Sequence, residues 1–198
     1  MIAIIDYRAG NVASVKNALD RLGVASLVTA DPAEVLAADG VIFPGQGRAG
    51  AAMKELKRTG LDQAIPRVTK PFLGICLGMQ LLAEFSEEDS VNCLGIIPGR
   101  CRKFPGTVKA PQLGWNKVSF KPASPLTKEF KDGEYFYFVH SYYSDVGRTF
   151  VTGTTDYGFE FASMLQKGNF YAVQFHPEKS GSAGQQLLKN FCEVSKCL

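Results

Sequence analysis

A cysteine between two glycines is the first place in the sequence where chemistry is expected. Residues 74–78 read GICLG, directly after a short apolar run, and a helical pattern follows at 77–85. This order predicts a strand, a sharp turn and a helix, the arrangement in which α/β hydrolases present a nucleophile. Gly74 and Gly78 fit because larger side chains would collide across so tight a turn. Cys76 is then expected at the carboxyl edge of a sheet, where the helix N-terminus favours its thiolate.

Taken alone, Cys76 would more often be a buried structural cysteine, since free cysteines are commonly buried. The flanking glycines favour the nucleophile, and they place the backbone N–H of Leu77 where it would face a developing oxyanion. A second donor is expected from residues 43–47 (FPGQG), through Gln46 and Gly47. The same letters also fit a plain turn between a strand and a helix. They do not fit a phosphate loop, because no Lys-Ser or Lys-Thr pair follows.

A thiol nucleophile needs a general base, and the base needs a partner that orients it. The sequence has two histidines. His176 ends the predicted strand 170–175 and is followed by Pro177 and Glu178, and in an extended chain residues two apart face the same side. We therefore expect Glu178 to hold His176. No carboxylate stands two residues after His140, so that histidine is assigned to packing or to lining the pocket.

The elements that position these groups follow from the spacing of apolar residues. In the first 90 residues strands alternate with helices; the strands are expected at 1–5, 25–29, 41–43 and 72–75, and the helices at 12–22, after 32, near 53–56 and at 77–85. Later strands follow one another near 100–104, 115–120, 135–139, 149–155, 161–166 and 170–175, before a helix at 183–194. The expected fold class is α/β, with an open, mostly parallel sheet flanked by helices and antiparallel additions in the C-terminal half. We expect one domain over residues 1–198.

Composition argues against several classes of protein. The chain of 198 residues is 45% hydrophobic and 21% charged, with a net charge of +3 and no dense basic run, so nucleic acid is not an expected partner. No apolar stretch approaches the roughly 18 residues that span a bilayer, and the N-terminus does not resemble a signal peptide. Five cysteines without a CxxC pattern argue against a disulfide framework or a zinc site and favour reduced thiols in the cytoplasm. No metal and no cofactor are expected.

Several segments together resemble the class I, or triad, glutamine amidotransferases. The cysteine segment continues to Gln80 in that family's form, Gly-x-Cys-x-Gly-x-Gln, and His-Pro-Glu stands at 176–178. Other segments are similar to one branch of the family, the glutaminase subunits of imidazole glycerol phosphate synthase; they are 112–116 (QLGWN), 138–143 (FVHSYY), 173–181 (VQFHPEKSG), and an opening with Asp6, Tyr7, Ala9–Asn11, Ser14 and Val15. These segments extend from the first strand to the last helix, so the resemblance covers the whole chain.

The resemblance implies a triad that hydrolyses glutamine to glutamate and ammonia. Cys76 would form a glutamyl thioester, His176 would carry the proton to the leaving ammonia, and Glu178 would orient His176. Gln80, with Ser141 and Tyr142, would hold the amino-acid end of glutamine, while Gly47 lines the same pocket.

The resemblance also implies a heterodimer with a (β/α)8 cyclase subunit. That partner would take the ammonia and form imidazole glycerol phosphate and AICAR in histidine biosynthesis. The interface residues it implies are Asn11, Trp115, Asn116, Tyr137 and Lys179. From the sequence alone, Trp115 fits a core as well as an interface.

Three positions depart from the branch. Gln46 stands where valine is usual and bears on how the loop turns its N–H inward, Arg8 replaces a common glycine, and Ala110 precedes Pro111 where methionine is usual. Three other functions stay open: another class I amidotransferase, serving anthranilate, aminodeoxychorismate or pyridoxal phosphate synthesis; a cysteine hydrolase of peptides or small amides, which would not need Gln80; and a binding subunit without activity.

Overall fold

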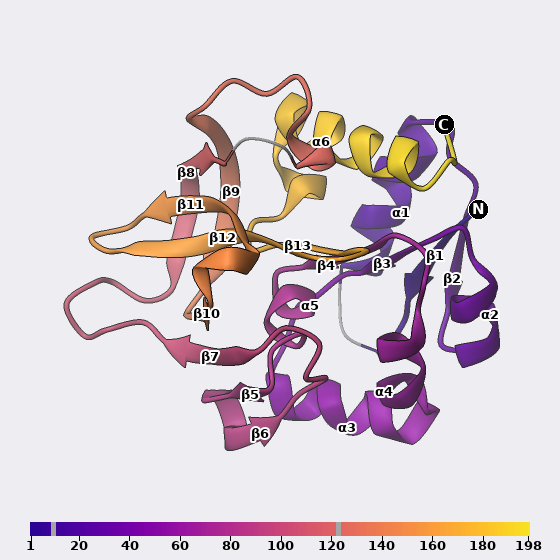
Figure 1. Ribbon diagram of the computed structural model, residues 1–198, viewed down its shortest axis with the longest axis horizontal. Helices are drawn as coiled ribbons and strands as arrows, with labels where there is room; N and C mark the ends of the chain where they lie inside the picture. The colour runs from indigo at the N-terminus through magenta and orange to yellow at the C-terminus, as the bar shows by residue number, and fades with distance from the viewer. Residues whose placement is uncertain (9–10, 122–123) are drawn as a thin grey trace.

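The computed structural model describes residues 1–8, 11–121 and 124–198, so Ala9 and Gly10 of the opening segment lie outside the described residues. Five parallel strands form the centre of the molecule, in the order β2-β1-β3-β4-β13 (Figure 1). They are β1 (Ile2–Ile5), β2 (Ser26–Thr29), β3 (Gly40–Phe43), β4 (Phe72–Ile75) and β13 (Phe170–Val173). The helices are α1 (Val12–Arg21), α2 (Pro32–Ala37), α3 (Ala49–Thr59), α4 (Leu61–Ala64), α5 (Leu77–Gln80) and α6 (Gly181–Val194).

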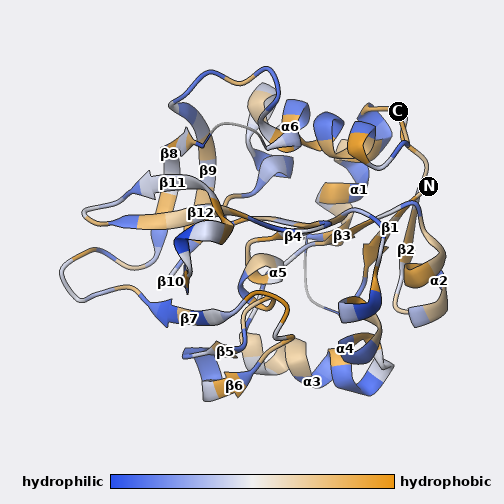
Figure 2. Ribbon diagram, viewed as in Figure 1, coloured by the Kyte–Doolittle hydropathy of each residue, from blue (hydrophilic) through white to orange (hydrophobic). Residues whose placement is uncertain are grey.

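The alternation of side chains along each central strand sends apolar groups to both faces of the sheet. Ile2 and Ile4 of β1 pack in one cluster with α1 and α6, while Ala3 and Ile5 pack in another with α2 and α3. Every residue of β1, β3, β4 and β13 is buried, as expected for parallel strands covered on both faces. These four strands carry no charged residue, whereas α6 has both polar and apolar positions (Figure 2).

The C-terminal half extends the sheet with antiparallel strands. They are β7 (Gly99–Lys103), β8 (Gln112–Phe120), β9 (Glu134–His140), β10 (Tyr142–Val146), β11 (Val151–Asp156) and β12 (Glu160–Lys167). Before them, the short strands β5 (Phe85–Ser86) and β6 (Val91–Asn92) pair antiparallel with each other, and β5 runs parallel to β7. Single 3-10 turns lie at η1 (Ile65–Arg67), η2 (Glu88–Ser90), η3 (Pro125–Thr127), η4 (Arg148–Phe150) and η5 (Pro177–Lys179). The expected fold class is confirmed: β12 joins β13 antiparallel, and β10, β7, β11, β8 and β9 follow in antiparallel pairs.

Some details of the expected elements were wrong, and the short elements α4, β5 and β6 were not predicted. The helix predicted over 77–85 ends at Gln80 after about one turn, because the next carbonyls bond elsewhere: those of Leu81, Leu82 and Ala83 accept from the backbone of 94–97. Strand β10 was not predicted, and its five residues pair with β7. Among the described residues, no helix is both long and apolar enough to cross a membrane.

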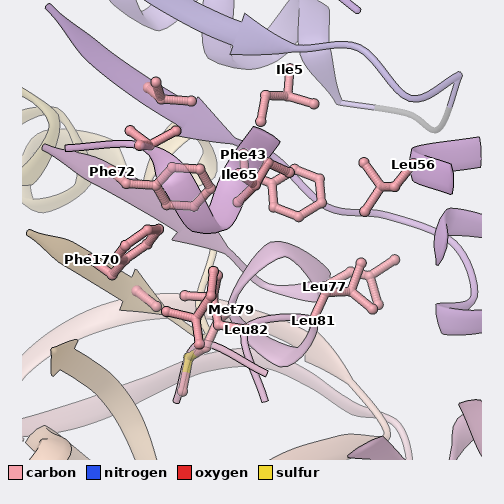
Figure 3. Close-up of a cluster of buried hydrophobic side chains, with 14 of the residues drawn as sticks. Ile5, Phe43, Leu56, Ile65, Phe72, Leu77, Met79, Leu81, Leu82 and Phe170 are labelled. Carbon is pink, nitrogen blue, oxygen red and sulfur yellow. The ribbon is translucent and has the colours of Figure 1, made fainter. Parts of the chain in front are cut away.

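The turn after β4 is anchored by one of the two apolar clusters. Figure 3 shows Leu77, Met79, Leu81 and Leu82 in the same cluster as Phe72 of β4. All four side chains of the turn are nearly or completely buried. The short helix α5 is thus stabilised by tertiary packing rather than by its own length, since isolated helical turns are unstable in water.

His140, at the end of β9, is buried inside an aromatic group at the edge of the sheet. Its ring contacts those of Phe104, Phe138 and Phe161. Burial lowers its pKa to about 4, with a smaller lowering from the charge of His176 and an opposing bond to the Tyr142 carbonyl. A carbonyl can only accept, so Nδ1, 2.7 Å from the Tyr142 oxygen, carries the proton of the neutral ring.

This buried neutral histidine predicts a loss of stability in mild acid. Between pH 6.5 and about 4 the unfolded chain binds a proton at His140 that the folded chain does not, so the unfolding free energy falls as pH falls, by about 3 kcal/mol across that window. Urea unfolding of wild type and His140→Gln, measured at pH 7 and pH 4.5, should show a smaller acid loss in the variant. Equal losses in the two proteins would refute the assignment.

Candidate active site

Cys76 occupies a strained turn between β4 and α5. Its φ of 53° lies in the left-handed region that non-glycine residues rarely adopt. Its N–H donates to the Val173 carbonyl at 2.8 Å, and its own carbonyl accepts from the Gln80 N–H at 3.1 Å. A Cβ on Gly78 would overlap the Phe43 carbonyl oxygen, and one on Gly74 would lie 2.8 Å from the Gly78 oxygen. The glycines are therefore required by close backbone approach, as the sequence predicts.

His176 and Glu178 are joined by a short contact in a buried place. Nδ1 of His176 lies 2.7 Å from Oε1 of Glu178, and the two side chains are 1% and 0% exposed. The expected geometry was wrong although the contact is present: β13 ends at Val173, and Glu178 sits in the 3-10 turn η5 rather than in extended chain. Pro177 begins that turn, which brings the carboxylate back under the ring.

The side chain of Asn11 completes this buried pair. Its Nδ2 donates to Oε1 of Glu178 and lies 3.5 Å from Nδ1 of His176. The resemblance assigned Asn11 to a partner interface, but here it contacts the candidate triad. The second carboxylate oxygen, Oε2 of Glu178, and Nε2 of His176 have no hydrogen-bond partner among the described residues.

The pKa of His176 is raised above the usual value. Burial alone would lower it, but the adjacent Cys76 sulfur and the Glu178 carboxylate together outweigh that effect. A histidine in this position keeps its proton at neutral pH when a negative sulfur stands beside it. His176 is therefore held in its protonated form, ready to give a proton to a leaving group.

A cavity of about 340 Å³ opens in front of Cys76 and His176, a size suited to a small molecule. It brings together all six of the oxyanion and substrate-binding residues that the sequence predicts: Gln46, Gly47, Leu77, Gln80, Ser141 and Tyr142. His140 also lines it, in agreement with the role assigned to that histidine. The remaining lining residues, which the sequence reasoning missed, are Gly45, Glu88, Pro111 and Val139.

Among these missed residues, Glu88 is the one whose side chain could bind a charged part of a substrate. Its carboxylate lines the cavity, and Oε2 accepts from the Ala49 N–H at 2.8 Å. The only sequence signal is an acidic run at 87–89, which by itself is typical of a solvated loop. Its proximity to Cys76 depends on the early end of α5, which the periodicity does not indicate.

Of the two predicted oxyanion donors, one is turned away. The N–H of Gln46 lies 3.2 Å from the Tyr7 hydroxyl oxygen, and that hydroxyl lies 3.4 Å from the Gln46 carbonyl. The backbone N–H of Gln46 is therefore not directed into the cavity. Leu77 is the first residue of α5, and Gly47 has a φ of 110°, a conformation that favours glycine.

Some of the residues assigned to a partner interface are exposed, and others are engaged within the protein. Trp115 on β8 is 56% exposed, beside Leu113 at 67% and Tyr135 at 49%, so it belongs to an apolar surface rather than to the core. Tyr137 on β9 meets the Trp115 ring edge to face. Asn116 is engaged within the sheet, where its Nδ2 donates to the carbonyl of Asp156 on β11 at 2.9 Å. Lys179 lies in η5, next to Glu178.

Main-chain hydrogen bonds of Tyr137 connect the apolar surface to the candidate triad. The His176 N–H donates to the Tyr137 carbonyl at 2.9 Å, and the Tyr137 N–H donates to the Ser180 hydroxyl at 3.0 Å. Strand β9 therefore has one residue whose side chain meets Trp115 and whose main chain holds the catalytic histidine candidate.

Comparison with known proteins agrees with the geometry. The family described as Glutamine amidotransferase class-I matches residues 3–194. Proteins named imidazole glycerol phosphate synthase subunit HisH are 48% identical in Listeria monocytogenes, 50% in Bacteroides fragilis and 51% in Moorella thermoacetica, each over 98% of this chain and 96%, 99% and 94% of the relative.

Solved structures show the same fold at low identity. A putative GMP synthase component from Thermoplasma acidophilum has a TM-score of 0.78 at 20% identity, covering 98% of this chain and 93% of its own. A structure of PurLQS from Thermotoga maritima has a TM-score of 0.72 at 18% identity, covering 97% of each chain. The resemblance given by the sequence is thus confirmed: the chain belongs to the class-I glutamine amidotransferases, and within them to the HisH subunits of imidazole glycerol phosphate synthase.

Proposed function

We propose that this chain hydrolyses glutamine at Cys76 and passes the ammonia to a (β/α)8 cyclase subunit of imidazole glycerol phosphate synthase. One observation carries the chemistry: Cys76 and His176 line one cavity, and Nδ1 of His176 lies 2.7 Å from Oε1 of Glu178. This is the nucleophile, base and orienting carboxylate of a hydrolytic triad.

The steps follow from that arrangement. The Cys76 thiolate attacks the side-chain carbonyl carbon of glutamine, and a carbon–sulfur bond forms while the carbonyl oxygen takes the negative charge. In this scheme the Leu77 N–H donates to that oxygen. His176 gives its proton to the leaving nitrogen, the carbon–nitrogen bond breaks and ammonia departs. Water, deprotonated by His176, then attacks the thioester, which releases glutamate and restores the thiolate–imidazolium pair.

The cavity offers groups for the amino-acid end of glutamine. Glu88 presents the carboxylate that a substrate ammonium requires, and Oε1 of Gln80 stays available because both of its amide hydrogens are used. Ser141 and Tyr142 line the same wall.

The partner is supported by the apolar surface formed by Leu113, Trp115 and Tyr135. Exposed aromatic residues of this kind are typical of the centre of protein interfaces. The other four cysteines are free, and burial raises the pKa of Cys93 and Cys192 to about 12 and also raises that of Cys101. Cysteines that stay free favour a reducing compartment such as the cytoplasm.

The first prediction concerns dependence on the partner. With the Gln46 N–H held by Tyr7, one expected oxyanion donor is missing, and the loss of one donor slows acyl transfer about 10²–10³-fold. Glutamate release from glutamine should be slow for the chain alone, rise by about that factor when the cyclase and its nucleotide ligand are added, and vanish in Cys76→Ala. Strong hydrolysis without the partner would point to another amidotransferase or to a hydrolase. Absence of Cys76-dependent turnover under every condition would leave a binding subunit.

The second prediction concerns the substrate ammonium. Glu88→Gln keeps an oxygen for the Ala49 N–H but removes the negative charge. A hydrogen bond to a charged group contributes about 1.5–3 kcal/mol, so KM for glutamine should rise about tenfold or more, with a smaller change in kcat. Glu87→Gln, at the exposed neighbouring position, is the matched control. An unchanged KM in Glu88→Gln would remove this residue from the substrate site.

The third prediction tests the docking surface. Trp115→Ala should weaken binding to the cyclase subunit by about 2 kcal/mol, or about 30-fold in Kd, as measured by calorimetric titration. Leu36→Ala is the control, because Leu36 is an exposed apolar residue of α2, at the opposite end of the molecule in Figure 1. Equal Kd values for both variants would place the interface elsewhere.

A further inference from the structure

A second amide side chain reaches the sulfur of Cys76. Gln174, just after β13, is completely buried, and its Nε2 lies 3.6 Å from Sγ of Cys76. Its Oε1 accepts from Nε2 of Gln80 at 3.1 Å. The same Nε2 of Gln80 donates to the Tyr142 carbonyl at 2.9 Å. An unbroken chain of hydrogen bonds therefore runs from a main-chain carbonyl to the nucleophile.

The direction of this chain is fixed by its far end. The oxygen and nitrogen of a glutamine amide have nearly the same shape, so the hydrogen-bond network must decide which is which. The Tyr142 carbonyl can only accept, so the amide nitrogen of Gln80 must face it. That nitrogen also faces Gln174, which must therefore present its oxygen to Gln80. The amide nitrogen of Gln174 is then left facing the sulfur, with an N–H directed at Cys76.

A fixed donor at the sulfur distinguishes the thiolate from the thiol. A hydrogen bond to an ionised acceptor is roughly twice as strong as one to a neutral acceptor. The opposite preference comes from the Val139 carbonyl, 3.8 Å from Sγ, which only a thiol hydrogen can satisfy. With His176 beside the sulfur as well, the balance between these groups determines how much reactive thiolate is present.

We propose that Gln174 is a further catalytic residue, whose Nε2–H donates to the Cys76 sulfur and stabilises the thiolate, and that Gln80 positions it. This proposal rests on the proposed role of Cys76 as nucleophile. It gives Gln80 a second task besides contact with substrate: its amide holds Gln174 in the one orientation that places a donor, and not an oxygen, against the sulfur.

The test measures the reactivity of Cys76 without glutamine and without a partner. The rate of its alkylation by iodoacetamide is followed against pH in a Cys197→Ser background, since Cys93, Cys101 and Cys192 are kept protonated by burial. Gln174→Leu should slow alkylation about tenfold at and below neutral pH, and the rates should converge in alkali, where the thiol ionises without help. Gln174→Glu should slow it further, because a carboxylate oxygen would face the sulfur.

Gln80→Leu should shift the alkylation profile in the same direction, although Gln80 does not touch the sulfur. The double variant with Gln174→Leu should be no slower than Gln174→Leu alone, since both changes break one chain. Gln166→Leu, the same substitution on the neighbouring strand β12, should leave the profile unchanged. If Gln174→Leu does not fold, Gln174→Met and Gln80→Leu carry the same readout.

Three results would overturn the proposal: an unchanged profile in the Gln174 variants, additive effects of the two changes, or an equal slowing at every pH, which would indicate only a displaced sulfur. The outcome is separate from the glutaminase assignment. Shifted profiles in a chain that never hydrolyses glutamine would support the hydrogen-bond chain and refute the proposed function. Normal hydrolysis with unshifted profiles would do the reverse.

Discussion

The close approach of the backbone at Gly78 to the end of β3 is the constraint on which the site depends. No side chain fits between Gly78 and the Phe43 carbonyl, and none fits between Gly74 and Gly78. The chain can therefore leave β4 only through a sharp turn, and the residue at its apex adopts a φ of 53°. Such strain persists only where the surroundings overdetermine it. Here the buried side chains of Leu77 and Met79 and the bond to the Val173 carbonyl supply that restraint.

The pairing of β4 with β13 then brings the other groups to Cys76. In the parallel register, Val173 lies beside Ile75, so the residues that follow each strand emerge at the same edge of the sheet. This places Gln174 and His176 next to Cys76 although they lie about a hundred positions later. A buried carboxylate is costly unless it is paired and hydrogen-bonded. His176 and Asn11 both contact Oε1 of Glu178, so one side chain at the start of α1 helps to hold the charge that the site requires.

The sequence was sufficient for groups whose roles depend on local geometry. The glycines around Cys76 indicated the nucleophile, and the alternation of strands and helices indicated the fold class. His176 and Glu178 were paired correctly, although their contact is made in the 3-10 turn η5 and not in extended chain. The sequence-based predictions failed where contacts between distant segments determine the structure. The helix after Cys76 ends at Gln80 because carbonyls of 81–83 bond to a later loop, and that early end brings Glu88 to the cavity. Gln174 belongs to the segment 173–181 that carries the family resemblance. Its orientation toward the Cys76 sulfur, however, depends on hydrogen bonds with Gln80 and, through it, with Tyr142.

The same dependence on distant segments explains how an event at the surface can reach the site. The Tyr137 carbonyl accepts from the His176 N–H, while its ring meets the exposed Trp115. A partner that moves β8 and β9 by a fraction of an ångström would therefore displace the main chain of His176 directly. In the loop after β3, the Gln46 N–H donates to the Tyr7 hydroxyl, so it is not free to donate to an oxyanion. Coupling between sites requires an element with two arrangements whose balance both sites affect. Near Cys76, the Gln46 loop has one defined arrangement in this structure: its N–H donates to Tyr7, and it ends at Gly47, whose φ of 110° favours glycine.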